Sequence, residues 1–183
     1  MYHYQKKLYV ARVNKDDKII NPVERWEAHK NSLLHRGFTA ILIYENKIVF
    51  QHRKHLVFDG YYDMTFSSHQ SFNGANLQND LEAVYSNLSR ECSIDRKDLL
   101  KQPVFINKVY YRAKDPKSEY SEHEIDYIYI AELKNKPDPN PEYAYGYELV
   151  ERNSLPDPSS LPHPLAPWVN KILEKNSLIM YAE

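Results

Sequence analysis

The chain has 183 residues, which is enough for one well-packed domain and short for two. Its 24 Lys and Arg residues nearly balance its 25 Asp and Glu residues, so nothing in the charge points to nucleic acid as a partner. A hydrophobic content of 42% excludes a disordered chain. Four glycines are too few for a Gly-rich phosphate-binding loop. The single cysteine, Cys92, cannot form an internal disulfide, which favours a reducing, cytoplasmic compartment. We expect neither a signal peptide nor a membrane span, because no apolar run is long enough.

Apolar segments in the first part of the chain predict strands. Residues 8–13 alternate apolar and polar side chains, and residues 38–44 form a continuous apolar run. The turn-like Glu-Asn-Lys after this run predicts a hairpin whose second strand covers residues 48–53. A loop over residues 57–63 leads to a short predicted strand over residues 64–68.

The segment over residues 76–92 is predicted to be a helix. Its apolar side chains recur at helical spacing, and they are Leu77, Leu81, Val84 and Leu88. Two further strands, over residues 103–113 and 125–133, are expected on either side of a charged loop that contains a proline.

The last part of the chain contains two Pro-rich connectors, residues 136–143 and 155–167. A strand over residues 145–151 is predicted after the first, and a helix over residues 168–176 after the second. Because the segment after each connector is too short to fold alone, we expect a single domain over residues 1–183. Strands mixed with a few helices predict an α+β fold, an α/β/α sandwich around a mixed sheet.

A pair of glutamates, Glu122 and Glu124, precedes an apolar strand. In a strand, residues two apart point to the same face, so both carboxylates would share a face with Asp126, Ile128 and Ile130. Such a face, acidic at one end and apolar further along, is expected where the inside of a sheet opens into a polar pocket. The alternative is that both glutamates lie at a strand end exposed to solvent, which is the commoner position of a Glu-x-Glu pair.

Three histidines, His29, His35 and His69, lie in separate segments with local patterns that suit a ligand. The first two are six residues apart, which is not a helical ligand spacing, so a turn must separate them. His69 comes after a strand and two serines. Alone, each is more often a surface or hydrogen-bonded histidine. Three imidazoles with two carboxylates suit a divalent ion of intermediate hardness, with one position left for water or substrate.

Glu91 is out of place on its helix. It lies three residues after Leu88 and seven after Val84, so it continues the apolar stripe, whereas Arg90 is predicted to point elsewhere. A charge in that position is costly unless it is paired or binds a metal. The alternative is that the helix has already reached solvent at this point. Cys92 shares the inward edge and is predicted to be a small core residue.

Several strings, taken in order, resemble one family. RWEAH and LLHRGF resemble its two histidine segments, and QHR with the later FDGYYD resembles its arginine-bearing strand and Trp-Pro-Gly-x-Trp segment. SSH resembles the family's Cys-Gly-His. VYYRAKDP resembles its Tyr-x-Arg-Ala segment, and EHE resembles its Glu-x-Glu pair. APWV resembles its late Pro-Trp. From about Val10 to Lys175 the chain thus resembles type I isopentenyl-diphosphate isomerase, a branch of the Nudix fold.

The resemblance implies roles for particular residues. It implies a divalent metal, Mn, Zn or Mg, on five ligands, and these are His29, His35, His69, Glu122 and Glu124. It further implies that Glu91 holds a magnesium bridging to the substrate diphosphate, and that Arg25 and Arg53 contact that diphosphate. Trp168 would stabilise a tertiary carbocation through its π face, and Tyr111 would hydrogen-bond within the active site.

The chain also departs from the family pattern. The family's acid/base cysteine, opposite Glu124, is Ser67 here, and the neighbouring glycine is Ser68. A thiol of pKa about 8.5 exchanges protons at neutral pH, whereas an unactivated hydroxyl is a far weaker acid. Where Nudix hydrolases have Arg-Glu-x-x-Glu-Glu, residues 86–91 keep only Glu91, and a basic diphosphate contact near Asn87 is lost.

These residues leave three hypotheses for the function. The first is an isomerase interconverting isopentenyl and dimethylallyl diphosphate, with Glu124 and Ser67 as the two proton-transfer positions. The second is a Nudix hydrolase of a diphosphate, disfavoured by the lost helix glutamates. The third is a non-catalytic binding protein that keeps the metal site. All three predict a small-molecule diphosphate ligand or a metal rather than nucleic acid or a membrane, and they leave the oligomeric state open.

Overall fold

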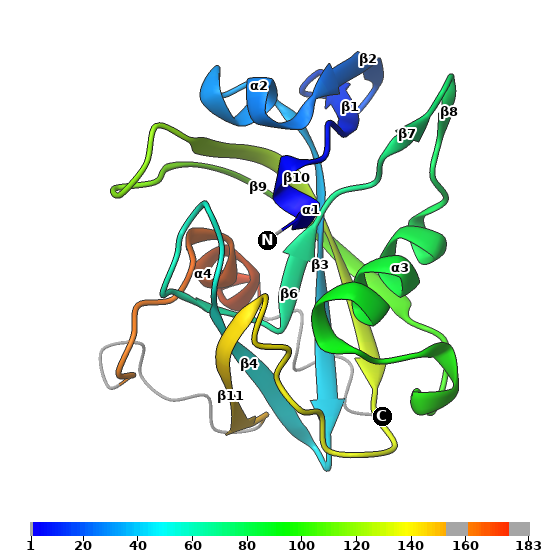
Figure 1. The fold of residues 1–183 in the computed structure, drawn as a ribbon, viewed down its shortest axis with the longest axis vertical. Helices are drawn as coiled ribbons and strands as arrows, with labels where there is room; N and C mark the ends of the chain where they lie inside the picture. Colours follow the sequence, from blue (N-terminus) through cyan, green and yellow to red (C-terminus); the bar gives the residue numbers. More distant parts are fainter. Residues whose placement is uncertain (1, 153–160, 176–183) are drawn as a thin grey trace.

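The computed structural model describes residues 2–152 and 161–175 (Figure 1). The helices are α1 (Tyr2–Gln5), α2 (Arg25–Lys30), α3 (Asp80–Cys92) and α4 (Pro167–Glu174), with a 3₁₀ turn at Arg96–Asp98. The strands are β1 (Tyr9–Val13), β2 (Ile19–Glu24), β3 (His35–Tyr44), β4 (Lys47–Arg53), β5 (Tyr62–Asp63), β6 (Phe66–Ser68), β7 (Phe72–Asn73), β8 (Asn76–Leu77), β9 (Val104–Lys114), β10 (Ser121–Glu132) and β11 (Ala144–Glu151).

A mixed sheet forms the centre of the described structure. β10 runs parallel to β3 and antiparallel to β9, whereas β1, β4 and β6 pair with β3 in the antiparallel sense. The helices α3 and α4 lie on opposite sides of this sheet (Figure 1). This arrangement confirms the α+β prediction and the α/β/α layering.

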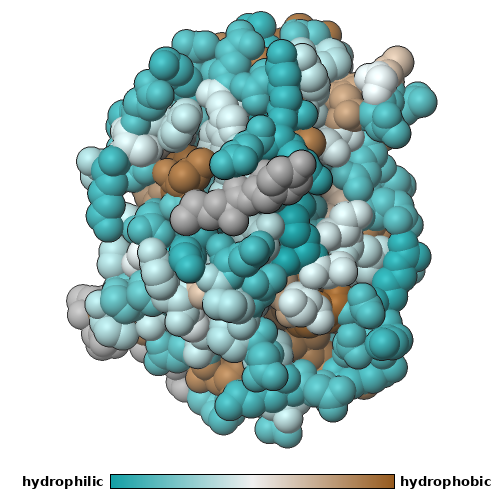
Figure 2. Space-filling model, viewed as in Figure 1, coloured by the Kyte–Doolittle hydropathy of each residue, from teal (hydrophilic) through white to brown (hydrophobic). Residues whose placement is uncertain are grey.

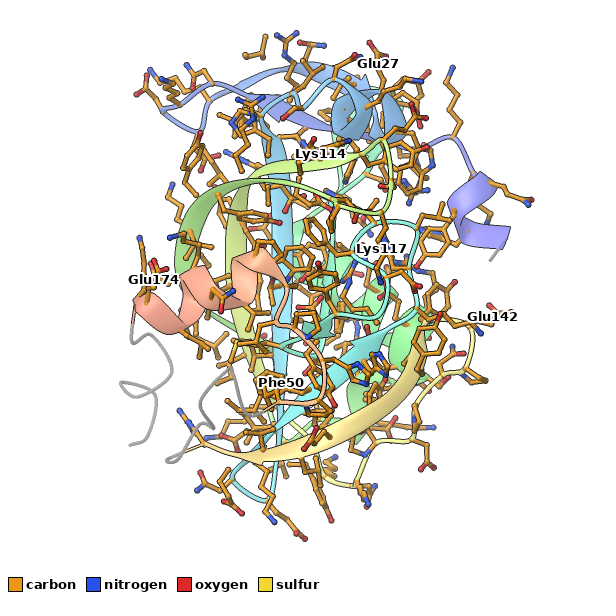
Figure 3. The ribbon with its side chains drawn as sticks, turned by 90° about the vertical axis from the view of Figure 1, so that its left-hand side faces the viewer. Glu27, Phe50, Lys114, Lys117, Glu142 and Glu174 are labelled. Carbon is orange, nitrogen blue, oxygen red and sulfur yellow. The ribbon has the colours of Figure 1, made fainter. Side chains whose placement is uncertain are left out.

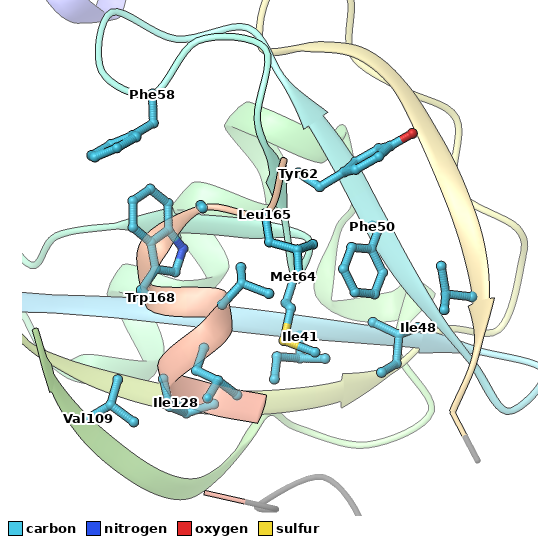
Figure 4. Packing of buried hydrophobic residues seen from close by; sticks show 14 of the residues in the cluster. Ile41, Ile48, Phe50, Phe58, Tyr62, Met64, Val109, Ile128, Leu165 and Trp168 are labelled. Carbon is cyan, nitrogen blue, oxygen red and sulfur yellow. The ribbon is translucent and has the colours of Figure 1, made fainter. Parts of the chain in front are cut away.

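Each face of the sheet has its own apolar core. On one face Trp168 and Ile172 of α4 pack with residues of the central strands such as Ile41 and Ile128, as Figure 4 shows for this cluster. On the other face Val84 and other apolar residues of α3 pack against the sheet. Burying a side chain of this size stabilises the fold by about 2 kcal/mol. The stripe predicted for α3 is therefore the packing face of that helix, and Cys92 belongs to its core as expected.

The surface is mostly polar. The face in Figure 2 is largely hydrophilic, with apolar residues in small, separate patches. In Figure 3, Glu27, Glu142 and Glu174 lie at the periphery, whereas Phe50 lies inside, where it is 2% exposed. Within residues 2–152 and 161–175, no helix is long and apolar enough to cross a membrane.

The hairpin predicted from the Glu-Asn-Lys turn is present. β3 pairs with β4 next to the turn, where Tyr44 faces Lys47. Glu45 and Asn46 have φ values of 47° and 61°, the left-handed conformation that a tight two-residue hairpin turn requires.

The helix predicted over residues 76–92 begins later than expected, at Asp80. Asn79 caps it, because its side chain accepts a hydrogen bond from the backbone N–H of Leu81 at 3.0 Å. The preceding β8 pairs with β7 around Gly74, whose φ is 60°. Leu77 therefore belongs to this small hairpin and not to the helical stripe.

Other elements differ from expectation in extent. β10 begins at Ser121 rather than at residue 125, so both glutamates of the Glu-x-Glu pair lie within the strand. The helix predicted over residues 168–176 spans Pro167–Glu174, and residue 176 lies outside the described residues. Much of the second Pro-rich connector, residues 153–160, also lies outside them.

Neither β2 nor α2 was predicted, and both lack the pattern that reveals an element. β2 pairs with β1 alone among the described strands and is mostly exposed, so its side chains do not alternate in polarity. α2 has six residues, which is too short for a helical period to recur.

Loss of the α3 cap should destabilise the fold. We expect Asn79→Ala to lower the free energy of unfolding by about 1 kcal/mol, because the Leu81 N–H loses its acceptor. Urea unfolding followed by circular dichroism measures the change. Asn79→Ser, which keeps a capping oxygen, is the control and should stay close to the wild type. Equal losses for both variants would contradict the cap.

Candidate metal centre and its cavity

Five side chains from distant parts of the chain meet at one point. Each offers a ligand atom, and all these atoms lie within 4.8 Å of one another; the residues are His29, His35, His69, Glu122 and Glu124. All are buried except His69, which is half-buried. The structure thus brings together the complete set that the sequence resemblance implied.

Strand register places the ligands. His35 is the first residue of β3, and the parallel pairing of β3 with β10 sets Glu124 directly beside it. β6 pairs with β3 and ends at Ser68, which delivers His69 to the same edge. α2 carries His29, and Ser32, with a φ of 51°, lies in the turn between α2 and β3.

Backbone carbonyls orient two of the imidazoles. The Nδ1 of His29 donates to the carbonyl of Arg25 at 2.7 Å, and the Nδ1 of His35 donates to that of Leu33 at 2.8 Å. With the proton on Nδ1, each ring presents the lone pair of Nε2 to the cluster. Both rings therefore have the orientation of a metal ligand.

The cluster has the features of a cation site. Glu122 Oε2 is buried without a hydrogen-bond partner, although it lies 3.1 Å from His29 Nε2. Gly37 leaves room for the Glu124 carboxylate, because a Cβ at that position would lie only 2.7 Å from its carboxyl carbon. Mixed imidazole and carboxylate ligands suit divalent transition ions. The residues present therefore fit a divalent metal.

The protonation states of Glu124 and His69 suit metal binding, whereas that of His29 does not. Burial alone would raise the pKa of Glu124, but His69 and His35 beside it hold that pKa well below its usual value. Burial lowers the pKa of His69 to about 4, so this ring is neutral at physiological pH. For His29, burial acts against the charged form, yet Glu122 raises its pKa to about 8. Glu124 would therefore be an anionic ligand, and His29 would have to lose a proton before binding a metal.

Tyr111 completes the surroundings of Glu124. β9 pairs with β10 so that these two residues lie side by side, and the Tyr111 hydroxyl donates to Glu124 Oε2 at 2.5 Å. Burial and the charge of Glu124 raise the pKa of Tyr111 well above its usual value. The phenol therefore stays neutral and remains a hydrogen-bond donor.

A pocket that is partly open to solvent lies beside the cluster and is called the cavity below. It is lined by four of the five ligands, with His35 as the exception. The other residues that the resemblance assigned to a site also line it, and they are Arg25, Arg53, Ser67, Glu91, Tyr111 and Trp168.

Glu91 faces the cavity but stands apart from the five-residue cluster. It is 7% exposed, so it continues the buried stripe as predicted and does not reach solvent. Burial raises the pKa of its carboxyl, and the Arg90 guanidinium lies 2.5 Å away.

The prediction that Arg90 points elsewhere is wrong. Helical spacing sets the direction of its Cβ, but the long side chain turns back, so that its Nη2 lies 3.3 Å from Ser68 Oγ and also contacts Asn87 and Glu91. A cationic group therefore lies beside Asn87, where the resemblance lacks a basic contact.

The N-terminal segment also contributes to the cavity, and no sequence pattern indicated this. His3 and Tyr4 of α1 line it, with Arg25 Nη1 lying 3.0 Å from His3 Nε2 and Trp26 Nε1 donating to the Tyr4 carbonyl at 2.9 Å. His55 lines it too, but neither it nor His52 or His123 belongs to the five-residue cluster. His123 instead contacts Ser32 and Tyr110.

Solved structures show the class of fold. The DR0079 protein of Deinococcus radiodurans superposes with a TM-score of 0.67 at 14% identity, over 91% of this chain and 98% of that one. A MutT NUDIX hydrolase from Burkholderia pseudomallei superposes with a TM-score of 0.53 at 18% identity, over 77% of this chain and 96% of that one. The protein has the Nudix fold, and likeness at such identities extends to the fold alone.

Sequence relatives show the family within that class. Isopentenyl-diphosphate Delta-isomerase 1 of Bos taurus is 31% identical over 156 residues, covering 76% of this chain and 68% of the relative. Isopentenyl-diphosphate delta-isomerase 2 of Homo sapiens is 26% identical over 186 residues, covering 89% and 79%. No family model matches the chain. The chain belongs to the isopentenyl-diphosphate isomerase family.

A methyl group at Gly37 should disrupt the metal centre. In Gly37→Ala the new Cβ collides with the Glu124 carboxylate, so we expect metal content to fall at least about tenfold. Elemental analysis of the purified protein measures it. Gly146→Ala is the matched control in a strand, since a Cβ there meets nothing within 4 Å. Full metal content in Gly37→Ala would contradict this geometry.

Metal affinity should depend on pH. Because His29 has a raised pKa of about 8 in the metal-free protein, protons compete with metal below that pH. We expect the association constant to fall by up to about tenfold per pH unit below about pH 8 and to level off above it. Calorimetric titration of metal-free protein with Mn²⁺ or Zn²⁺ measures this, and an affinity constant across the range would count against His29 as a ligand.

Proposed function

We propose that the protein is an isopentenyl-diphosphate Delta-isomerase, which interconverts isopentenyl and dimethylallyl diphosphate. The observation that carries the proposal is the position of Glu124. This carboxylate belongs to the five-residue cluster, is held by Tyr111, and faces the cavity that Trp168 lines. This position, in a chain whose named relatives are isomerases, supports Glu124 as a proton-transfer group.

A divalent ion on the cluster, Mn²⁺, Zn²⁺ or Mg²⁺, would supply positive charge that keeps the Glu124 carboxylate ionised and polarised. Both oxygens of Glu124 have partners in the chain. Oε2 accepts from Tyr111, while Oε1 lies 2.7 Å from His69 and 3.2 Å from His35. In our proposal Glu124 transfers one proton at its side of the substrate, and Ser67 occupies the opposite position.

The arginines of the cavity would hold the diphosphate, with Glu91 binding its Mg²⁺. The Nε atoms of Arg25, Arg53 and Arg90 are buried and have no hydrogen-bond partner among the described residues. Such donors suit the oxygens of a bound anion. Burial and the charge of Arg90 lower the pKa of Arg25 to about 10, which supports the same role, because an anion would relieve the repulsion.

Trp168 would stabilise the positive charge that develops on the substrate. Its ring is 1% exposed and already has a cation over it, since the Arg53 guanidinium lies 4.9 Å from the ring centroid. Tyr111 lies 5.7 Å away, centroid to centroid. These two aromatic rings beside the cavity support that role, because aromatic faces attract a cation.

The two other hypotheses have weaker support. A Nudix hydrolase gathers several carboxylates around Mg²⁺, but on residues 86–91 Glu91 is the lone acidic residue. The two other acidic residues of α3, Asp80 and Glu82, lie in the first turn, at the opposite end of the helix from Glu91. A non-catalytic binding protein is favoured by one observation, the serine at position 67. A cytoplasmic location, inferred from the single cysteine, forms part of the isomerase proposal.

One assay separates the three hypotheses. Purified protein is incubated in heavy water with isopentenyl diphosphate, Mg²⁺ and either Mn²⁺ or Zn²⁺. An isomerase forms dimethylallyl diphosphate and incorporates deuterium, and Glu124→Gln should abolish both. If neither product nor deuterium appears, the isomerase proposal fails. Phosphate release from a panel of nucleoside diphosphates would instead favour the hydrolase, and metal binding without any turnover would favour the binding protein.

Substitution of Ser67 tests its place in the reaction. We expect Ser67→Cys to raise kcat by about tenfold or more, because a thiol exchanges protons more readily at neutral pH. Ser67→Ala should lower kcat by about tenfold or more. Steady-state kinetics measure both, with Ser68→Ala as a neighbouring control. A harmless Ser67→Ala would show that Ser67 has no part in proton transfer.

A further inference from the structure

A fully buried carboxylate contacts three residues that line the cavity. Asp63, at the end of β5, is 0% exposed. Its Oδ2 accepts from Arg53 Nη1 at 2.6 Å, and its Oδ1 accepts from Trp168 Nε1 at 2.8 Å and from Ser67 Oγ at 3.1 Å. One carboxylate therefore contacts three residues to which the proposed function gives a role around the substrate.

Ser67 has two neighbours but a single proton. Its Oγ lies 3.1 Å from Asp63 Oδ1 and 2.8 Å from Thr39 Oγ1, which is itself bonded to Asp126 at 2.7 Å. When the Ser67 proton points to the Asp63 carboxylate, Oγ keeps a lone pair that can accept a proton, and Ser67 is a half-buried residue that lines the cavity. In this arrangement Ser67 is a proton acceptor from the cavity with a base directly behind it.

We propose that Asp63 is the positioning residue and proton acceptor behind Ser67, so that the pair performs the proton transfer opposite Glu124. The proposal rests on the isomerase function above. In one direction a C–H bond of the carbocation breaks and its electrons form the new C=C bond. The proton goes to Ser67 Oγ, and the Ser67 hydroxyl proton passes to Asp63 Oδ1, which becomes a neutral carboxylic acid.

In the reverse direction the same protons return, and the π electrons of the double bond take up the proton from Ser67. Ser67 begins and ends each direction as a neutral hydroxyl, so no alkoxide is required. A C–H bond next to a carbocation is strongly acidic, and a carboxylate is therefore a sufficient base. Because Ser67 lines the cavity, the proton on Asp63 returns to solvent through the same hydroxyl.

The surroundings of Asp63 hold its carboxylate in place. A buried carboxylate is costly unless it is paired and hydrogen-bonded, and here Arg53 supplies the opposite charge while Trp168 supplies a second donor. The Arg53–Asp63 pair has side chains that are 4% and 0% exposed, so water does not screen it. The carboxylate is thus oriented toward Ser67 before the substrate binds.

A double-mutant cycle tests the proposal. Asp63→Asn is measured in the wild-type chain and in the Ser67→Cys chain, because a thiol carries an exchangeable proton of its own and needs no base behind it. With Ser67 present, we expect Asp63→Asn to lower kcat at least about 100-fold while KM changes less than about threefold. With Cys at position 67, the loss in kcat should be less than about threefold.

The outcomes are distinguishable. Equal losses in the two chains, or no loss in either, would overturn the inference and leave Asp63 as structural support for Arg53 and Trp168. A wild-type protein without turnover would overturn the isomerase proposal and this inference with it. Asp115→Asn is the matched control, because Asp115 is a carboxylate only 2% exposed that bonds Ser118 and the Phe58 backbone outside this network.

Folding of the variants has its own check. Metal content of each protein should match that of the wild type, since Asp63 is not one of the five clustered ligands. If the unpaired Arg53 charge prevents Asp63→Asn from folding, the same cycle is run in the Arg53→Gln chain, where both charges of the pair are removed. The loss in kcat caused by Asp63→Asn is then measured relative to the Arg53→Gln protein, once with Ser and once with Cys at position 67. A large loss with Ser and a small loss with Cys supports the inference, and equal losses overturn it.

Discussion

The parallel pairing of β3 with β10 is the interaction on which the candidate centre depends. It sets Glu124 beside His35 and Asp126 beside Gly37, while β9 brings Tyr111 to Glu124 from the other side. A slip of one residue in this register would turn every one of these side chains to the opposite face. The ligand geometry, the phenol donor and the space left by Gly37 are therefore consequences of one strand alignment.

One cavity brings together two kinds of buried charge. The carboxylates and imidazoles of the metal cluster are suited to a cation. The Asp63–Arg53 pair is already balanced, and the remaining arginine donors of the cavity are suited to an anion. Because burying unpaired charge is costly, each set would be stabilised by a ligand of opposite sign. The metal diphosphate of the proposed function carries both kinds of charge.

Local sequence patterns predicted the strands with continuous or alternating apolar residues and the inward face of α3. They missed β2 and α2, which lack such patterns, and they misdirected Arg90, because periodicity describes the Cβ and not the end of a long side chain. Strand alternation correctly grouped Glu122 with Glu124. The three histidines meet only through long-range pairing, so their grouping came from family resemblance, and Asp63 had no local signal at all.

The alignment of β3 with β10 also has a kinetic consequence. The two strands are far apart in the sequence. Contacts between such distant segments form slowly, because the entropy of closing a long loop is lost before the contact stabilises the chain. His35 and Glu124 become neighbours only when that closure is complete. The rate at which a refolding chain takes up a metal ion would therefore report the formation of this long-range contact. That rate would depend on chain topology rather than on the chemistry of the ion.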